Sequence, residues 1–565
     1  MNRFLRRALI GFLTGAMASI ALISTLQNVA LAIGLGILVG MASAILFHPA
    51  RGAYMDSVLT LAALGAPIWA VVNIILLPLL MGQAPQWTPD GMRAAFPALV
   101  GWILYGATLG FLIQLLNDAA QKIFGAEFLP PIPPREIKTC VVILGGGFAG
   151  VTTAQCLEKE FGADRSIEFT LVSDTNALLF TPMLAEVAGS SLEAAHISTP
   201  LRSSVKRTNV VRGTVQRIDL ENRCVELAPP RNADASLPRQ ILFDHLVIAL
   251  GSKSNYLGMT GVQAKASNFK ALTDAIEIRN HVIDCIERAE HERGAARRRA
   301  LLTFVVAGGG FAGAELAGAL NDFVRGSLLD YPNLSQEDVK IIVVHSRALI
   351  LPELTEGLAA YAMEKMRQRG VTFIMNARVA DATADAVLLT PEQTIMTETL
   401  VWTAGSAPHP LLQTLACERD QRGALMADAT VAVKGQKNIW TLGDCAHVPN
   451  GATNASCPPT AQFALRQAKT LAHNIHATVH NQPLQNFSFK PLGISCVVGH
   501  QTACVELNVP LTHFTIRFSG LLAWLGWRAI YLYKLPGLER QVRVLGDWVI
   551  ELFFPRDIVQ TVEFE

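Results

Sequence analysis

Charged residues are scarce in this sequence of 565 residues: Asp, Glu, Lys and Arg make up 16% of it, against 51% hydrophobic residues. The formal net charge is only +1, which argues against a nucleic-acid-binding protein, because such proteins usually carry a strong basic excess. The nine cysteines include no C-x-x-C pair and no zinc-like spacing, so no metal site is expected. We predict reduced, packed thiols in a protein that faces the cytoplasm.

The apolar excess lies at the front of the chain, where no charged residue occurs between Ala8 and Phe47. About 19 helical residues, each rising about 1.5 Å, span the hydrocarbon core of a bilayer. Soluble helical bundles need a polar helix face, which these stretches lack. We therefore predict a four-helix transmembrane domain over residues 1–125, with spans at Ala8–Leu26, Val29–Phe47, Ser57–Met81 and Ala94–Leu116.

A signal peptide over Met1–Ala32 is an alternative for the first span. Three arginines lead the apolar stretch, and Ala30-Leu31-Ala32 resembles a cleavage site. The apolar run resumes directly after this point, which favours a membrane helix instead.

Basic residues predict the orientation of this domain. Arg3, Arg6 and Arg7 precede the first span, Arg51 lies in the second connection, and Lys122, Arg135 and Lys138 follow the fourth span, whereas only Arg93 lies on the other side. We expect both ends of the domain, and hence the catalytic part of the chain, to be cytoplasmic. No Asp, Glu, Lys, Arg or His lies in the middle of a span, which argues against an ion pump and favours an anchor or docking surface.

A stiff, proline-rich linker over residues 126–136 is predicted to end the membrane domain. It is followed by an apolar strand, Cys140–Leu144, and then by a G-x-G-x-x-G fingerprint, which is typical of a dinucleotide-binding turn between a strand and a helix. We expect its glycines to allow the tight turn, the approach of a pyrophosphate and close helix packing. The predicted cofactor-binding residues are Gly145, Gly147, Phe148, Ala149 and Gly150.

A second copy of the same six letters follows the apolar strand Phe304–Ala307. Two strand–turn–helix units of this kind in one chain predict two bound dinucleotides. The binding residues of the second unit are predicted to be Gly308, Gly310, Phe311, Ala312 and Gly313.

A ribose-binding acid usually ends the next strand of such a unit. Ser173 and Asp174 follow the strand Ile167–Val172 of the first unit, whereas His345 and Arg347 follow the strand Val339–Val344 of the second. Without an acid there, the second unit has nothing to repel a 2′-phosphate. Both NADH and NADPH therefore stay open. Either Arg347 or His345 would contact the 2′-phosphate of NADPH, or His345 would contact the ribose of NADH.

Three later segments resemble signatures of two-dinucleotide flavoproteins. Gly443-Asp444 matches the pair that closes their FAD site, and Ala249-Leu250-Gly251 and Thr403-Ala404-Gly405 match their strand ends. The resemblance implies an FAD domain in two parts, residues 137–270 and 405–490, interrupted by an NAD(P) domain over residues 271–404.

The chain resembles, more specifically, the type II NADH:quinone oxidoreductases over residues 137–565. The segments that carry the resemblance are Leu179–Leu184, Gly308–Gly318, Ile350–Leu354, Gly443–Ala446 and Pro458–Gln462. The implied fold is α/β, with two Rossmann-like domains for FAD and NADH or NADPH. The resemblance also implies FAD contacts at Thr181, Val215 and Ala461, and a catalytic Glu315 close to the nicotinamide and flavin.

The quinone-site motif of that family reads A-Q-x-A-x-Q. Gln462 and Ala464 match it, but Arg466 stands at the last place, with Gln467 beside it. These four residues are the predicted quinone contacts. A cation in place of an amide is expected to strengthen a hydrogen bond to a quinone carbonyl.

The C-terminal region, residues 491–565, is predicted to lie at the membrane interface. Trp524, Trp527, Tyr531 and Tyr533 occur with Arg528 and Lys534, and the next helix repeats apolar residues at Leu538, Val542, Leu545, Val549 and Leu552. Aromatic and basic residues beside an apolar stripe are typical of interfacial helices. The alternative is packing against the catalytic core or against a partner, in a homodimer or larger membrane assembly.

The resemblance implies ping-pong transfer of two electrons from NAD(P)H through FAD to a quinone, with no charge movement across the membrane. A sulfide:quinone oxidoreductase on the same fold is the alternative; its chemistry would need Cys445 and Cys457, whose spacing matches no known motif of that kind. A redox-inactive assembly subunit is a further alternative, which the intact fingerprints argue against.

Overall fold

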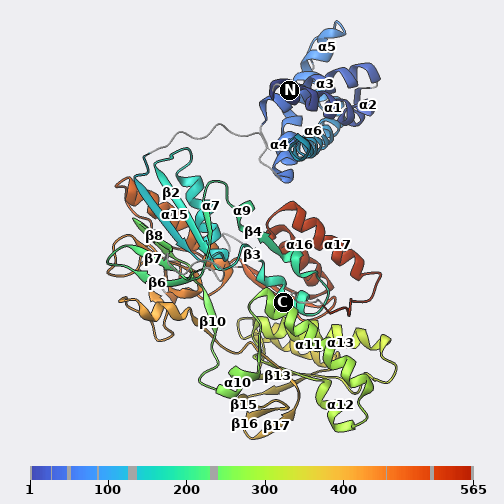
Figure 1. Cartoon of the computed structure of the whole chain (residues 1–565). Helices are drawn as coiled ribbons and strands as arrows, with labels where there is room; N and C mark the ends of the chain where they lie inside the picture. Colours follow the sequence, from blue (N-terminus) through green and yellow to red (C-terminus); the bar gives the residue numbers. More distant parts are fainter. Residues whose placement is uncertain are drawn as a thin grey trace. The chain divides into compact units, whose positions relative to one another are not determined.

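The computed structural model describes residues 3–26, 28–47, 53–85, 88–124, 136–229, 239–453, 455–508 and 514–560. The chain divides into two units, residues 1–133 with 537–539 and residues 134–536 with 540–565, which are described separately (Figure 1). The predicted linker, residues 126–136, lies outside the described residues except for Glu136.

The described residues of the first unit form helices and their connections. Its elements are α1 (Arg3–Ala18), α2 (Ile20–Leu26), α3 (Val29–Leu46), α4 (Tyr54–Trp69), the π-helical η1 (Ala70–Leu76), α5 (Leu77–Leu80) and α6 (Pro89–Phe124). In the part of the chain that the structure describes, three helical stretches are long and apolar enough to cross a membrane: Val29–Leu46, Tyr54–Leu79 and Gly91–Ala120. The first expected span, Ala8–Leu26, is instead divided at Ser19 between α1 and α2, so the count of four spans stays a prediction.

Small residues bring α1 and α3 close together. A Cβ atom on Gly40 would lie 2.5 Å from the carbonyl oxygen of Gly11, and one on Gly15 would lie 2.4 Å from that of Gly36. Glycines four residues apart on each helix therefore let the two backbones touch, as in many membrane helix pairs. Tyr105 of α6 donates a hydrogen bond to the Gly36 carbonyl at 2.6 Å. This bond holds α6 against the contact between α1 and α3.

The second unit begins with a parallel five-stranded sheet in the order β21-β9-β1-β2-β5. Its strands are β21 (Ile439–Thr441), β9 (His245–Ile248), β1 (Thr139–Leu144), β2 (Ile167–Ser173) and β5 (Asn209–Arg212). The helices α7 (Phe148–Glu160) and α15 (Ala461–Val479) pack against each other beside it. Residues 141–144 of β1 are all buried, because a parallel sheet is covered on both faces, which explains the uninterrupted apolar run in the sequence.

A second parallel sheet follows in the order β11-β18-β12-β13-β14. Its strands are β11 (Ser267–Asn268), β18 (Thr399–Trp402), β12 (Thr303–Ala307), β13 (Lys340–His345) and β14 (Val371–Met375), and α13 (Phe311–Ser327) follows β12. The chain then returns to the first sheet, where β21 pairs with β9. The first fold is therefore split in sequence by the whole of the second.

The C-terminal part contains an antiparallel sheet of β25 (Gly493–Val497), β26 (Ala503–Asn508) and β27 (Thr515–Gly520), followed by α16 (Leu521–Lys534) and α17 (Leu538–Glu551) (Figure 1). Trp524 and Trp527 of α16 are buried, with 6% and 2% of their surface exposed. The guanidinium group of Arg528 lies over the ring of Trp524 at 3.8 Å. These three side chains pack inward, whereas Leu522 and Tyr533 of the same helix are exposed. The position of the C-terminal helices at the membrane interface stays a prediction. On α17, the apolar residues Val542, Leu545 and Val549 are exposed.

Candidate active site

The first fingerprint forms a tight turn between β1 and α7. Gly145 has φ +114°, and a Cβ atom there would lie 2.2 Å from the carbonyl oxygen of Ala249. A Cβ atom on Gly150 would lie 1.9 Å from the oxygen of Gly145. Gly147 precedes the first residue of α7, and no described atom lies within 4 Å of the position where its Cβ would be. This open space at a helix N-terminus fits a pyrophosphate group.

The second fingerprint repeats this geometry. Gly308 has φ +117°, and a Cβ atom on Gly313 would lie 1.9 Å from its carbonyl oxygen. Gly310 precedes α13 and again has no described atom within 4 Å of its Cβ position. Both turns are therefore shaped to receive phosphate against a helix N-terminus.

The Gly443-Asp444 loop and α15 meet the first turn. Gly443 has φ +73°, and its Cβ position lies 3.2 Å from the Cβ of Ala149 in α7 and 3.7 Å from that of Ala464 in α15. The backbone N–H of Gly443 donates to the side-chain Oε1 of Gln467 at 2.9 Å. The fingerprint helix, the Gly443-Asp444 loop and α15 thus converge at one point.

Two residues at this loop were not predicted from the sequence. The hydroxyl of Ser252 donates to Asp444 Oδ2 at 2.9 Å, and Lys270 Nζ donates to Ser252 Oγ at 2.8 Å. Burial lowers the pKa of Lys270, whereas the charge of Asp444 raises it. Lys270 lies far from any motif in the sequence, so only the tertiary structure reveals its link to Asp444.

The strand ends differ between the two units. Ser173 is buried beneath the first turn, and a Cβ atom on Gly146 would lie 2.3 Å from its hydroxyl. Asp174, one residue later, is exposed. In the second unit the ring Nδ1 of His345 accepts a hydrogen bond from the backbone N–H of Gly309 at 3.0 Å. Burial, followed by the charge of Arg347, lowers the pKa of His345.

Glu315 lies in the first turns of α13, two residues after Gly313. Its Oε1 accepts a hydrogen bond from the backbone N–H of Val497 at 3.3 Å. Burial is the main cause that raises its pKa to about 8, and the charge of Glu186 adds to it. At neutral pH the carboxyl therefore holds a proton, which suits a group that donates one.

The predicted quinone residues of α15 separate in the structure. Gln462 bonds through both amide atoms to the backbone of Leu492 and Gly493, at 2.7 and 3.1 Å. Ala464 and Gln467 are buried, and Gln467 holds Gly443. Arg466 alone is exposed, with its guanidinium 5.4 Å from the ring centroid of Phe489.

The remaining predicted cofactor residues lie at the ends of strands and helices. Phe148 contacts Phe180 edge to face at 5.7 Å between ring centroids. Gly251 has φ +68° directly before β10 (Ser252–Ser254). A Cβ atom on Gly405 would lie 2.5 Å from the oxygen of Asn255. The others are Thr181 at the start of η2 (Thr181–Met183), Val215 in β6 (Val215–Asp219), Ala461 at the start of α15, Phe311 and Ala312 at the start of α13, and the exposed Arg347.

The cysteines give no support to sulfur chemistry. All nine are free thiols. Cys445 is buried, its Sγ lies 3.3 Å from the carbonyl oxygen of Ile248, and burial raises the pKa of its thiol. A buried thiol of this kind is a poor nucleophile.

Comparison with known proteins agrees with this geometry. Residues 139–468 match the family of pyridine nucleotide-disulphide oxidoreductases. A probable NADH dehydrogenase of Dictyostelium discoideum is 31% identical over 424 residues, covering 74% of this chain and 90% of that protein. The type II NADH:quinone oxidoreductase Ndh of Mycobacterium tuberculosis is 27% identical over 444 residues, covering 75% of this chain and 90% of its own length.

Among solved structures, that of NDH2 from Plasmodium falciparum in complex with NADH is similar in fold. The TM-score is 0.67 at 18% sequence identity, and the match covers 75% of this chain and 100% of that one. A sulfide:quinone oxidoreductase from Aquifex aeolicus shares the fold at a TM-score of 0.55 and 18% identity, over 74% of this chain and 95% of that one.

Proposed function

Because this chain belongs to the pyridine nucleotide-disulphide oxidoreductases, and among them to the type II NADH:quinone oxidoreductases, we propose that FAD binds at Gly145–Gly150 and the nicotinamide nucleotide at Gly308–Gly313. The enzyme oxidises NADH and passes the electrons to a quinone. The assignment of the two sites is supported by one observation above all: the Gly443-Asp444 loop and α15 meet the first turn and not the second.

The residues of the chain have separate tasks in this proposal. The free N–H groups at the start of α7 and of α13 bind the two pyrophosphates. Asp444, held by Ser252, binds the first cofactor, and His345 lies beside the ribose of the second. Glu315 holds a proton at its carboxyl group. A bound flavin would supply the acceptance of hydride and the release of two electrons.

The finer location is also part of the proposal. The apolar helices of the first unit anchor the chain in the membrane as a multi-pass domain, with the catalytic unit on the cytoplasmic side. The exposed apolar residues of α17 lie against lipid, where a quinone dissolves. The absence of ionisable residues from the middle of the spans argues against proton pumping.

Purification of the full chain in detergent tests this function. Extraction of the cofactor followed by mass analysis should give FAD, at one per chain. NADH should bleach the flavin absorbance, and a quinone should restore it. Protein without flavin, or a flavin that sulfide bleaches and neither NADH nor NADPH does, would overturn the proposal.

A further inference from the structure

A small pocket of about 40 Å³ lies among α8 (Leu184–Ala188), α13, α16 and α17. Glu315 lines it from α13. Glu186 of α8, which the predicted site does not include, lines it as well, and so does Trp527 of α16. The pocket thus joins the proposed catalytic acid to a second buried acid.

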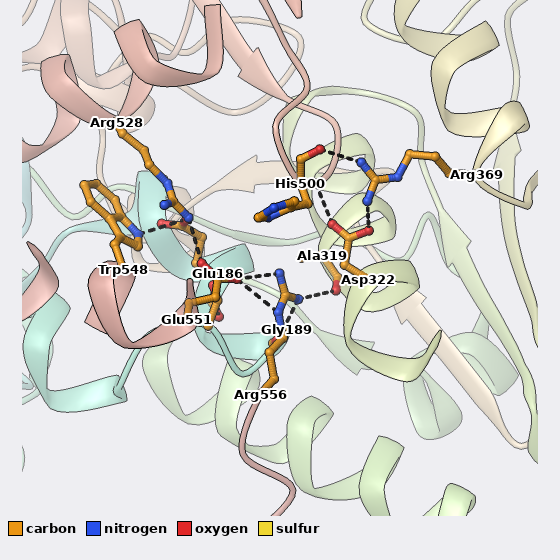
Figure 2. Close-up of polar contacts among 11 residues, drawn as sticks. Glu186, Gly189, Ala319, Asp322, Arg369, His500, Arg528, Trp548, Glu551 and Arg556 are labelled. Atoms are coloured by element: carbon orange, nitrogen blue, oxygen red, sulfur yellow. Dashed lines mark hydrogen bonds and ion pairs between the residues drawn. The ribbon is translucent and has the colours of Figure 1, made fainter. Parts of the chain in front are cut away.

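Ion pairs fix most of the charged groups around this pocket (Figure 2). Glu551 accepts from Arg528 Nη2 at 2.8 Å and from Arg556 Nη2 at 2.8 Å. Asp322 pairs with Arg369 and also accepts from the backbone N–H of His500 at 2.6 Å. The opposite charges of Asp322 and Arg369 therefore compensate each other.

Glu186 is held less completely. Its Oε1 accepts from Trp548 Nε1 at 3.2 Å and lies 3.8 Å from Arg528 Nη2. Its Oε2 is buried and has no hydrogen-bond partner among the described residues. The same holds for Arg528 Nε and for the indole N–H of Trp527, whose side chain is only 2% exposed. Buried polar atoms beside a cavity are typically satisfied by ordered water.

The number of acidic and basic groups around the pocket explains why two carboxyl groups would share a proton. The carboxyl groups of Glu186, Glu315 and Glu551 face two guanidinium groups, those of Arg528 and Arg556, so one carboxyl group exceeds the cations. Burial lowers the pKa of His500, and it raises the pKa values of Cys496 and Tyr531 beside Glu315. None of these three adds a compensating charge near neutral pH.

We propose that Glu186 and Glu315 share one proton through water held in this pocket, and that Glu186 is a positioning residue that resupplies Glu315. The proposal rests on the proposed function. Reduction of a quinone to a quinol takes up two electrons and two protons. Hydride from NADH carries both electrons and one proton, so the second proton comes from solvent, and the pair Glu186–Glu315 stores it until Glu315 releases it toward the reaction.

Infrared spectroscopy of the full chain in detergent tests the shared proton without turnover. In the wild type, burial raises the pKa of Glu186 to about 7 and that of Glu315 to about 8, so the protonated-carboxyl band should disappear in two coupled steps. Glu186→Gln should leave one step, at a lower pH than the second wild-type step, because the charge of Glu186 no longer acts on Glu315. The matched control Glu193→Gln, at an exposed residue of the same segment, should keep both steps.

Stopped-flow kinetics adds the functional readout. In Glu186→Gln, reoxidation by quinone should slow by at least about tenfold and change its pH profile, while reduction by NADH keeps its rate. Glu186→Asp, which keeps a carboxyl group, should restore much of the loss and also serves if the Gln variant does not fold. Two unchanged titration steps in Glu186→Gln, or an unchanged pH profile, would overturn the shared proton. Wild-type protein that fails to reduce quinone with NADH would overturn the proposed function instead. The infrared titration steps would still show whether Glu186 and Glu315 share a proton.

Discussion

The Nδ1 atom of His345 accepts a hydrogen bond from the backbone N–H of Gly309, at 3.0 Å, where related nucleotide folds usually place an acid. The bond holds the end of β13 against Gly309, which lies between Gly308 and Gly310 of the second fingerprint. The other ring nitrogen, Nε2, is buried without a hydrogen-bond partner among the described residues. Since Nδ1 accepts, Nε2 carries the proton, and the strand end holds no carboxylate that would repel a 2′-phosphate.

We therefore expect weak discrimination between NADH and NADPH. His345→Glu introduces a carboxylate that repels the 2′-phosphate, so kcat/KM for NADPH should fall at least about tenfold relative to that for NADH, which corresponds to about 1.4 kcal/mol. Steady-state kinetics with both nucleotides measures the ratio. Arg347→Ala, at the exposed neighbour, tests whether this second predicted residue contributes to the use of NADPH. A wild type that rejects NADPH by more than about a hundredfold, or about 3 kcal/mol, would contradict the argument from the missing acid.

The two equivalent glycines Gly147 and Gly310 give a reciprocal test of the cofactor assignment. Alanine is tolerated by the backbone at both, with φ −81° and −76°, and the added methyl group would project only into the space proposed for pyrophosphate. Gly147→Ala should lower the flavin content of purified protein. Gly310→Ala should keep the flavin and raise KM for NADH by about tenfold or more. Loss of flavin from the Gly310 variant instead would show that the two sites had been exchanged.

These fingerprints could be predicted from the sequence because their geometry depends on local rules. A strand, a turn with positive φ and a helix occupy adjacent residues, and the glycines mark the positions where a Cβ would collide. The split of the first fold could be predicted for the same reason, because each part carries its own short signature.

The inward packing of Trp524, Trp527 and Arg528 could not be predicted in this way. Tryptophan and arginine near an apolar stripe occur both at membrane interfaces and in buried cation–π clusters, and only tertiary contacts distinguish the two. Arg528 lies between the rings of Trp524 and Trp548, at 3.8 and 4.6 Å, and Trp548 comes from another helix. The pocket around Glu186 depends on the same long-range contacts and has no signature in the sequence.

Substitutions of Arg466 and Gln467, which are adjacent in the sequence, should impair two different properties of the protein. Gln467→Leu leaves the buried N–H of Gly443 without its acceptor, which costs about 1–3 kcal/mol, so flavin content and thermal stability should fall. Arg466→Gln changes an exposed side chain and should alter KM for the quinone while flavin content stays the same. Flavin absorbance and quinone kinetics on both variants separate the effects. Equal quinone kinetics in Arg466→Gln and the wild type would remove Arg466 from the predicted quinone site.

The exposed apolar residues of α17 should bind lipid independently of the first unit. A protease site introduced within residues 126–136 releases the second unit, which should still sediment with anionic vesicles. Leu545→Glu, at a residue 49% exposed, should weaken this binding, because a charge replaces an apolar side chain at the lipid surface. A released unit that stays soluble and keeps its activity toward long-chain quinones would refute the lipid contact.

Glu315 links the pH dependence of stability to that of catalysis. Burial raises its pKa to about 8 from an ordinary value of 4.5. The folded protein therefore binds this proton more tightly than the unfolded chain does. The bound proton contributes fully to the free energy of unfolding below the pKa of Glu315 in the unfolded chain. This contribution is lost as the pH rises through the pKa in the folded protein, because a buried carboxylate with few compensating contacts then remains. Glu315→Gln keeps the shape and cannot ionise, so its Tm relative to wild type should rise between pH 5 and pH 9.

The same substitution should slow quinone reduction, because glutamine cannot supply a proton, while hydride transfer from NADH keeps its rate. We expect a loss of about tenfold to a hundredfold in the reoxidation step, most visible below pH 8, where the wild-type carboxyl is protonated. Stopped-flow absorbance separates the two half-reactions, and thermal scans across the same pH range report the linkage. Glu315→Asp, which retains a carboxyl group, should recover part of the rate. If both half-reactions of Glu315→Gln match the wild type at every pH while its Tm shows the expected rise, Glu315 is a buried acid of structural importance only, and the proton for the quinol enters elsewhere.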